Sequence, residues 1–121
     1  MGLDMHAMIT KEPLAGEADC NPVEVEDLYS WRRHHGLHAW MKELYFMKGG
    51  TDRMFNGATV VLNAQDLDVL HIIIKASPLL ETAGLYFDIP DETEILGDLE
   101  FVTLARKALA DGYSVLYTSS W

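Results

Sequence analysis

Segments with a two-residue repeat of apolar side chains alternate along this chain with segments whose apolar residues recur every three or four positions. The first repeat is typical of a half-buried β-strand and the second of an amphipathic helix. A chain that alternates between the two buries both kinds of apolar face by placing helices against a sheet. The pattern therefore predicts an α+β fold. Because the strands are half-polar, helices are expected mainly on one face of a single mixed β-sheet.

The predicted elements follow the order β-α-β-α-β-α-β, with four to five strands and about three helices. Strands are expected at 3–10, 58–62, 84–90 and 113–121, with a possible extra strand at 23–27. Helices are expected after the candidate N-caps Ser30, Asn63 and Asp98, and Gly112 is expected to end the last one. In the first helix the apolar stripe consists of Leu37, Trp40, Met41, Leu44 and Met47. With no repeat or linker, residues 1–121 are expected to form one α+β domain.

The charge is acidic and unevenly distributed. The net charge is −10, and it divides into −6 over residues 1–29, +3 over 30–56 and −7 over 57–121. Affinity for nucleic acid comes mostly from Lys and Arg that neutralise phosphates, so direct nucleic-acid binding is not expected. Solubility is the simplest explanation of the acidity. Mimicry of nucleic acid by the carboxylates of residues 81–100 remains an open alternative.

The expected compartment is the cytoplasm of a bacterial cell or of a phage-infected host. No apolar run approaches the roughly 20 residues that span a bilayer, so no membrane association is expected. The first residues lack the basic region of a secretory signal. Cys20 is the single cysteine, so there can be no internal disulfide, and this fits a reducing compartment.

The stretch "SWRRHHGLHAWMKELYFMKGG" at residues 30–50 holds the candidate metal ligands. On a helix His34 and His38 share a face, and this spacing allows both to bind one metal ion. A zinc site needs further ligands, which only Asp4, His6 or His71 could supply. The other interpretation is that both histidines border the core and form hydrogen bonds beside aromatic rings. We favour it, and we therefore expect no metal and no cofactor.

The same stretch begins with a candidate anion-binding group. Trp31, Arg32 and Arg33 lie near the predicted helix N-terminus, where backbone N–H groups and the helix dipole favour negative charge. A phosphate, a nucleotide or an acidic protein segment would fit there. The alternative is that the arginines pair with the protein's own carboxylates, which outnumber the basic groups 19 to 9.

Asp4 and His6 are the remaining catalytic candidates, beside His34 and His38. Residues at positions i and i+2 share one face of a strand, and an Asp–His pair can orient a general base. The chain has neither a "GxSxG" motif nor a phosphate-binding "GxxxxGK[ST]" loop. Whether the protein is an enzyme stays open. Trp121 at the end of the sequence is expected to pack against the fold or a second subunit.

Three pieces of the chain are together similar to one group of proteins: "MGLDM", "YSWRRHHGLHAWM" and "LYTSSW". They resemble small phage and bacterial proteins that begin MGLDM, carry a Trp-Arg-Lys segment leading into a helix, and end on a Ser-Ser-Trp-like tail. Here Arg33 stands where Lys is common. The resemblance implies a phage or phage-like origin and an intracellular setting. It implies no activity, cofactor or catalytic residue.

The favoured hypothesis is a non-enzymatic acidic protein that acts through protein–protein interaction or self-association. It rests on the absence of a reaction motif and on aromatic residues suited to interfaces. The alternative is a ligand- or metal-binding protein, or a small enzyme, that uses Trp31, Arg32, His34 and His38.

Overall fold

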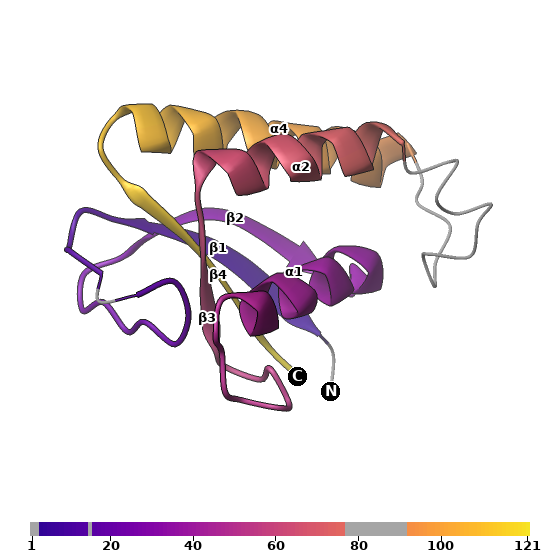
Figure 1. The fold of residues 1–121 in the computed structure, drawn as a ribbon. Coiled ribbons are helices and arrows are strands. Elements are labelled where there is room, and N and C mark those ends of the chain that lie inside the picture. Colours follow the sequence, from indigo (N-terminus) through magenta and orange to yellow (C-terminus); the bar gives the residue numbers. More distant parts are fainter. Residues whose placement is uncertain (1–2, 15, 77–91) are drawn as a thin grey trace.

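The structure, a computed structural model, describes residues 3–14, 16–76 and 92–121 (Figure 1). Within these ranges the strands form one antiparallel sheet in the order β2-β1-β4-β3. The strands are β1 (Asp4–Thr10), β2 (Glu26–Arg32), β3 (Thr59–Leu62) and β4 (Ser114–Ser120). The helices are α1 (His35–Met47), α2 (Ala64–Lys75) and α4 (Glu92–Ala110). The predicted α+β class is confirmed, and none of these helices is long and apolar enough to cross a membrane.

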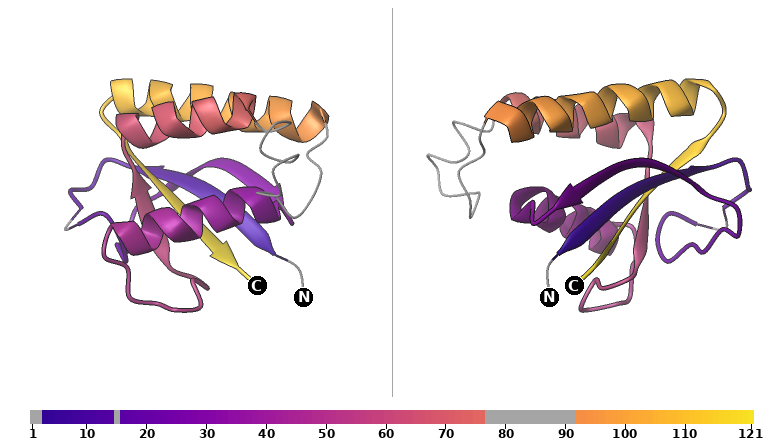
Figure 2. Two further views of the ribbon diagram at one scale, coloured as in Figure 1. Left: turned by 45° about the vertical axis from the view of Figure 1, so that its right-hand side comes forward. Right: turned by 180° about the vertical axis from the view of Figure 1, so that it is seen from behind.

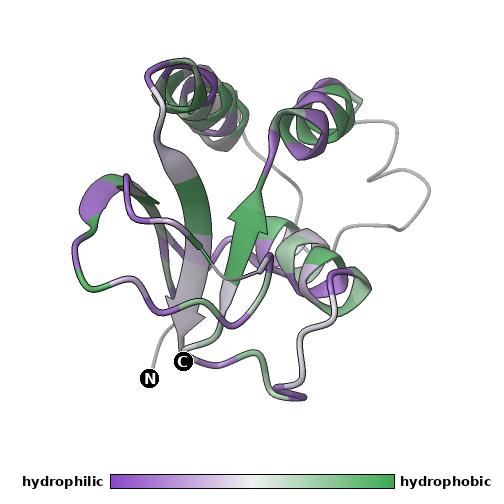
Figure 3. Ribbon diagram, turned by 60° about the vertical axis from the view of Figure 1, so that its left-hand side comes forward, coloured by the Kyte–Doolittle hydropathy of each residue, from purple (hydrophilic) through white to green (hydrophobic). Residues whose placement is uncertain are grey.

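The helices cover one face of the sheet, with α2 and α4 side by side and α1 across the middle (Figures 1 and 2). The strand pattern explains this layering. In β1, Met5 and Ala7 are buried, whereas Asp4 and His6 are half-buried and face the other way. Figure 3 shows that β3 and the middle of β4 are strongly hydrophobic. The core therefore lies between this face and the helices, to which α1, α2 and α4 all contribute buried side chains.

All strand pairings among the described residues are antiparallel, whereas a mixed sheet was predicted. The observed element order is β-β-α-β-α-α-β, which matches the predicted order only in part. The central strand β4 pairs with β1 and β3, and β1 also pairs with β2. These partners lie far apart along the chain, and strand direction is decided by pairing that no local pattern encodes. The predicted strand at 84–90 lies outside the described residues.

The segment around Ser30 is a strand and not the start of a helix. The extra strand predicted at 23–27 is displaced to Glu26–Arg32, where Trp31 pairs with Met5 of β1. Arg33 then adopts a left-handed conformation (φ 56°) that turns the chain, and α1 begins at His35. Trp31 satisfies both the two-residue repeat of the strand and the helical spacing to the residues after it. The backbone pairing of Trp31 with Met5 decides in favour of the strand.

The other predicted helix ends are partly right. Asn63 caps α2, because its side chain accepts the Asp66 N–H (2.8 Å) and the Asp66 carboxylate accepts the Asn63 N–H (2.9 Å). Gly112 lies just after α4 with φ 90°, as expected of a residue that ends a helix. Asp98 is not a cap, since α4 begins at Glu92 and Asp98 lies inside it, 6% exposed. Its carboxylate instead accepts hydrogen bonds from side chains far away in the sequence.

The loop between β1 and β2 protects the outer edge of β3. Ala18 forms an isolated antiparallel bridge with Val60. The bridge is flanked by the hydrogen bonds from Asp19 N–H to the Thr59 carbonyl (2.9 Å) and from Val61 N–H to the Glu17 carbonyl (2.8 Å). An edge strand with unpaired backbone groups promotes aggregation. The loop therefore removes that liability on one side of the sheet.

Replacing Gly50 with alanine is expected to destabilise the protein by about 1–3 kcal/mol. A Cβ at Gly50 would lie 2.3 Å from ring atoms of Tyr45. The ring cannot move aside easily, because Tyr45 is fully buried and its hydroxyl donates to the Asp19 carboxylate (2.5 Å). The same hydroxyl accepts the N–H groups of Thr51 (3.0 Å) and Asp52 (2.8 Å). Urea denaturation measures the effect.

Gly16→Ala is the matched control for this substitution. A Cβ at Gly16 meets nothing within 4 Å. The Gly16→Ala substitution should therefore change the protein's free energy of unfolding by no more than about 0.5 kcal/mol. Equal effects at both glycines would show that the close approach to the Tyr45 ring does not constrain Gly50.

Candidate functional site

The structure divides the predicted site residues between the two faces of the sheet. In the β1–β2 register, Asp4 lies opposite Arg32 and His6 lies opposite Ser30, and both pairs are on one face of the sheet. Met5 and Trp31 form the pair between them and point to the other face, toward the helices. The catalytic candidates Asp4 and His6 therefore face away from Trp31 and the core. The set of side chains that the alternative hypothesis needs in one place is not brought together.

On the outer face the predicted residues form two exposed pairs. The Arg32 guanidinium lies 3.4 Å from the Asp4 carboxylate, with side chains 81% and 47% exposed. His6 Nδ1 lies 3.2 Å from the Ser30 hydroxyl. Exposed ion pairs contribute about 0.2–1 kcal/mol. Arg32 thus pairs with a carboxylate of its own chain. This pairing is the alternative that the sequence analysis gave to an anion-binding site.

On the inner face the carboxylate of Asp98 joins β2, α1 and α4. One oxygen accepts the indole N–H of Trp31 (3.0 Å), and the other lies 2.7 Å from His34 Nε2. His34 Nδ1 accepts the backbone N–H of Leu37 (3.4 Å), which makes His34 the N-cap of α1. Because Nδ1 acts as an acceptor, the ring proton belongs on Nε2, from where it is donated to Asp98. Both nitrogens of His34 are therefore engaged inside the fold.

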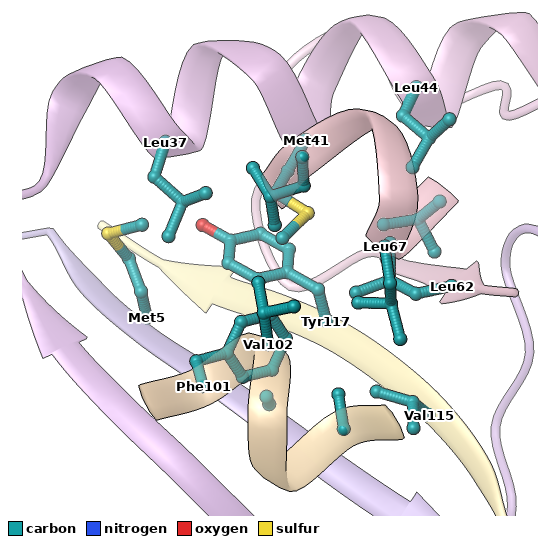
Figure 4. Close-up of a cluster of buried hydrophobic side chains, with 14 of the residues drawn as sticks. Met5, Leu37, Met41, Leu44, Leu62, Leu67, Phe101, Val102, Val115 and Tyr117 are labelled. Atoms are coloured by element: carbon teal, nitrogen blue, oxygen red, sulfur yellow. The ribbon is translucent and has the colours of Figure 1, made fainter. Parts of the chain in front are cut away.

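His38 is held by a different partner. Its Nδ1 lies 2.9 Å from the hydroxyl of Tyr117, and its ring stacks on Phe55 with centroids 5.3 Å apart. Tyr117 is fully buried between α1 and α4 (Figure 4). Burial raises the pKa of Tyr117 far above its usual value, so the phenol stays protonated and donates to His38 Nδ1. The hydrogen bond between His38 and Tyr117 therefore attaches α1 to β4.

The arrangement offers no assembled metal centre in the part of the chain that is described. No three His, Cys, Asp or Glu side chains of these residues gather closely enough to hold an ion. His34 and His38 lie four residues apart, but they turn nitrogens toward Asp98 and Tyr117, respectively. His71, the third-ligand candidate on α2, lies 3.4 Å from the guanidinium of Arg106.

The anion-binding group of Trp31, Arg32 and Arg33 is also dispersed. Trp31 uses its N–H for Asp98 and packs its ring against Phe101, with centroids 4.8 Å apart. Arg32 lies on the opposite face of the sheet. Arg33 occupies the exposed turn, where its N–H donates to the Leu3 carbonyl (2.9 Å). The indole and the two guanidinium groups therefore belong to three different surroundings.

Acidification is expected to destabilise the protein in part through His38. Burial, followed by the positive charges of Lys42 and His35, lowers the pKa of His38 below its usual 6.5. The unfolded chain then binds a proton more readily than the native state, so stability is lost as pH falls through about 6.5 and toward the lower native pKa. His38→Gln keeps an acceptor for Tyr117 and should flatten this dependence. Urea denaturation from about pH 7.5 to about pH 5 measures it, and identical slopes for both proteins would contradict it.

Sequence reasoning missed the roles of Asp98 and Tyr117. The sequence predicts Asp98 as an N-cap, although Ile95, Phe101 and Val102 lie three or four positions from it and place it on the apolar face of α4. An acid on such a face signals a buried partner. Tyr117 is predicted only as part of a strand. Its role depends on His38, 79 positions away in the sequence, and no local signal reveals that pairing.

A hollow between α1 and α2 is likewise absent from the sequence-based predictions. It has a volume of about 160 Å³ and is lined by Trp40, Glu43, Leu44, Met47, Asp66 and Val69. Met47 is expected in the buried stripe of α1, but it is 82% exposed, because the helix ends there and α2 does not cover it. Lys48 fixes the two helices together, since its ammonium donates to the Asp66 carboxylate (2.5 Å) and to the Val61 carbonyl (2.6 Å).

Comparison with known proteins identifies no family for this chain. Neither the models of protein families, nor the curated proteins, nor the solved structures include a match to this chain.

Proposed function

We propose that the protein acts by binding another protein through the hollow between α1 and α2, without catalysing a reaction. The observation that carries this proposal is the exposure of apolar side chains around a preformed depression. Met47 is 82% and Val69 is 49% exposed, while Leu44 forms part of the lining at 8% exposure. Apolar side chains that are exposed together around a depression are typical of a surface that a partner covers.

The size of the hollow favours a protein partner over a small ligand. At about 160 Å³ it is smaller than the roughly 300–1,000 Å³ of typical small-molecule sites. It accommodates one apolar side chain of a partner, and such anchors contribute much of the affinity at protein interfaces. Trp40 in the wall supplies the aromatic contact area on which such anchors depend.

The charge around the hollow specifies the partner further. The carboxylate of Asp66 is already neutralised by Lys48, whose side chain is 8% exposed. Glu43 is exposed, and no Lys or Arg is among the residues that line the hollow with it. A partner that places a Lys or Arg beside its apolar anchor would meet Glu43, and the net charge of −10 would steer it to the surface.

The engagement of His34 and of His38 Nδ1 inside the fold supports a non-catalytic function. His34 is bound by Asp98 and Leu37, and His38 by Tyr117. A general base needs a nitrogen within reach of a substrate proton. The resemblance at three short motifs and the single cysteine support a bacterial or phage-infected cytoplasm as the setting.

Selection from a displayed library of random peptides tests the proposal. The selected peptides should share one large apolar residue next to a Lys or Arg. The double substitution Met47→Gln and Val69→Gln should weaken their binding at least about tenfold, the equivalent of about 1.4 kcal/mol. Fluorescence anisotropy with purified protein gives the dissociation constants.

The matched control is Met54→Gln with Leu96→Gln, which removes two apolar side chains of similar exposure (58% and 60%) from other surfaces. It should leave binding nearly unchanged. Equal loss in both variants, or peptides without the apolar–basic pair, would overturn the proposal. So would a concentration-dependent dimer that only the Met47/Val69 variant abolishes, since the partner would then be a second copy.

A further inference from the structure

The β1–β2 loop begins at the end of the sheet away from both termini (Figure 1). Residues from this end of β1 and from the loop line a second hollow. Its volume is about 640 Å³. It is lined by Ile9, Thr10, Lys11, Glu12, Val23, Glu24, Val25, Glu26 and Tyr113. None of these residues lines the α1–α2 hollow, so a ligand bound here would be independent of the proposed function.

Hydrogen bonds hold the wall of this hollow in place. The hydroxyl of Thr10, which is 2% exposed, donates to the Glu24 carbonyl (2.7 Å) and accepts the Glu12 N–H (3.1 Å). The Glu12 carboxylate in turn accepts the Glu24 N–H. Residues 12 and 24 are thus tied to the end of β1. A binding surface that is already ordered loses less conformational entropy when it is occupied.

The chemistry of the lining suits a cation on an aliphatic stem. The Lys11 ammonium lies 4.8 Å from the ring centroid of Tyr113, so this ring already receives a cation. Three acidic residues, Glu12, Glu24 and Glu26, are among the lining residues, beside the single basic residue Lys11, which leaves two negative charges in excess. The apolar side chains of Val23 and Val25 complete the wall.

The exposure of the valines identifies the kind of occupant. Val23 is 89% and Val25 is 40% exposed, although β-branched apolar side chains next to a strand are usually covered. A lone inorganic cation would leave them uncovered. A Lys or Arg side chain would cover them with its methylene stem while its charged head meets Glu24, Glu26 and the ring of Tyr113.

We propose that this hollow binds a basic segment of a partner protein, with one Lys or Arg side chain inserted between Tyr113 and the carboxylates of Glu24 and Glu26. Lys11 occupies the place of that side chain in the free protein and is displaced on binding. Glu12 has a positioning role, because its carboxylate is already used by the Glu24 N–H.

The probe is a short fluorescein-labelled peptide in which lysine and arginine alternate with serine, so it lacks the apolar anchor expected at the α1–α2 hollow. The readout is fluorescence anisotropy with the full-length protein. The wild-type protein should bind it, and binding should weaken as salt is raised. Glu24→Gln with Glu26→Gln should weaken binding by about tenfold. The control pair Glu17→Gln with Glu100→Gln makes the same change in net charge at exposed positions that line neither hollow, and it should change the affinity by less than about twofold.

Lys11 provides the sharper test. Lys11→Met should strengthen binding by about threefold, because it removes the competing cation from the Tyr113 ring. Lys75→Met removes the same charge from α2 and should leave the affinity nearly unchanged. Circular dichroism confirms that each variant is folded, so a lost fold cannot be mistaken for lost binding.

Several results would overturn the proposal. Equal weakening by both glutamate pairs, or equal strengthening by both lysine variants, would show that only the overall charge attracts the peptide. No binding of the peptide at low salt would also exclude it. If spermidine competed as strongly as the peptide and showed the same dependence on Glu24 and Glu26, the occupant would be a small polyamine and not a protein segment.

Discussion

Asp98→Ala is expected to lower the free energy of unfolding by about 2–5 kcal/mol. Asp98 is 6% exposed, and its carboxylate accepts hydrogen bonds from Trp31 and His34. Its removal takes this acceptor from buried His34 and half-buried Trp31, and a buried donor that loses its acceptor costs about 1–3 kcal/mol. Since domains are stable by only about 5–15 kcal/mol, the loss is a large share of the total. Urea denaturation followed by tryptophan fluorescence measures it.

Two further variants separate the causes. Asp98→Asn keeps one acceptor oxygen and the side-chain volume, so it should cost about 1–3 kcal/mol. Asp68→Ala removes a carboxylate that pairs with Arg106 at 2.8 Å but has a side chain that is 66% exposed, so it should cost less than about 1 kcal/mol. Equal small losses at Asp98 and Asp68 would show that the junction of β2, α1 and α4 does not depend on the buried carboxylate.

Tyr117→Ala is the second large effect, with an expected loss of about 3–5 kcal/mol. The ring is fully buried, stacks on Phe55 with centroids 5.9 Å apart, and lies 6.3 Å from the ring of Trp31. Leu37 and Met41 of α1 lie over the same ring (Figure 4). Removing it leaves a cavity between α1 and α4, both of which pack on it. Urea denaturation gives the free energy.

Tyr117→Phe is the matched variant, because it keeps the ring and removes only the hydroxyl. It should cost about 0.5–1.5 kcal/mol, the contribution of a single hydrogen bond, here the one to His38. If Tyr117→Phe were as costly as Tyr117→Ala, the hydroxyl and not the ring would hold α1 on the sheet.

Local patterns predicted much of the fold. The alternation in β1, the β-branched residues of β3 and the Asn63 cap of α2 each depend on neighbours within about one helical turn. Such elements were placed within one or two residues of their observed ends. The prediction for residues 26–34 was wrong, because Trp31 satisfies the strand pattern and the helix pattern alike. Only its pairing with Met5 decides between them.

The sequence singled out Trp31, His34 and His38 as candidate site residues, but it did not reveal their surroundings. It could not show that Asp98 binds two of them from 64 or more positions away, or that Tyr117 binds the third. It placed Asp4 and Arg32 in separate candidate groups, whereas the β1–β2 register makes them partners.

By itself, the sequence determined the α+β class, the positions of most helices and strands, and the acidic charge, since these depend on composition and short-range periodicity. Only the tertiary structure decided strand direction and order, the partners of the histidines and the two surface hollows. The reason is physical: local preferences act between neighbours in the chain, whereas a buried hydrogen bond or a hollow forms only when distant segments pack together.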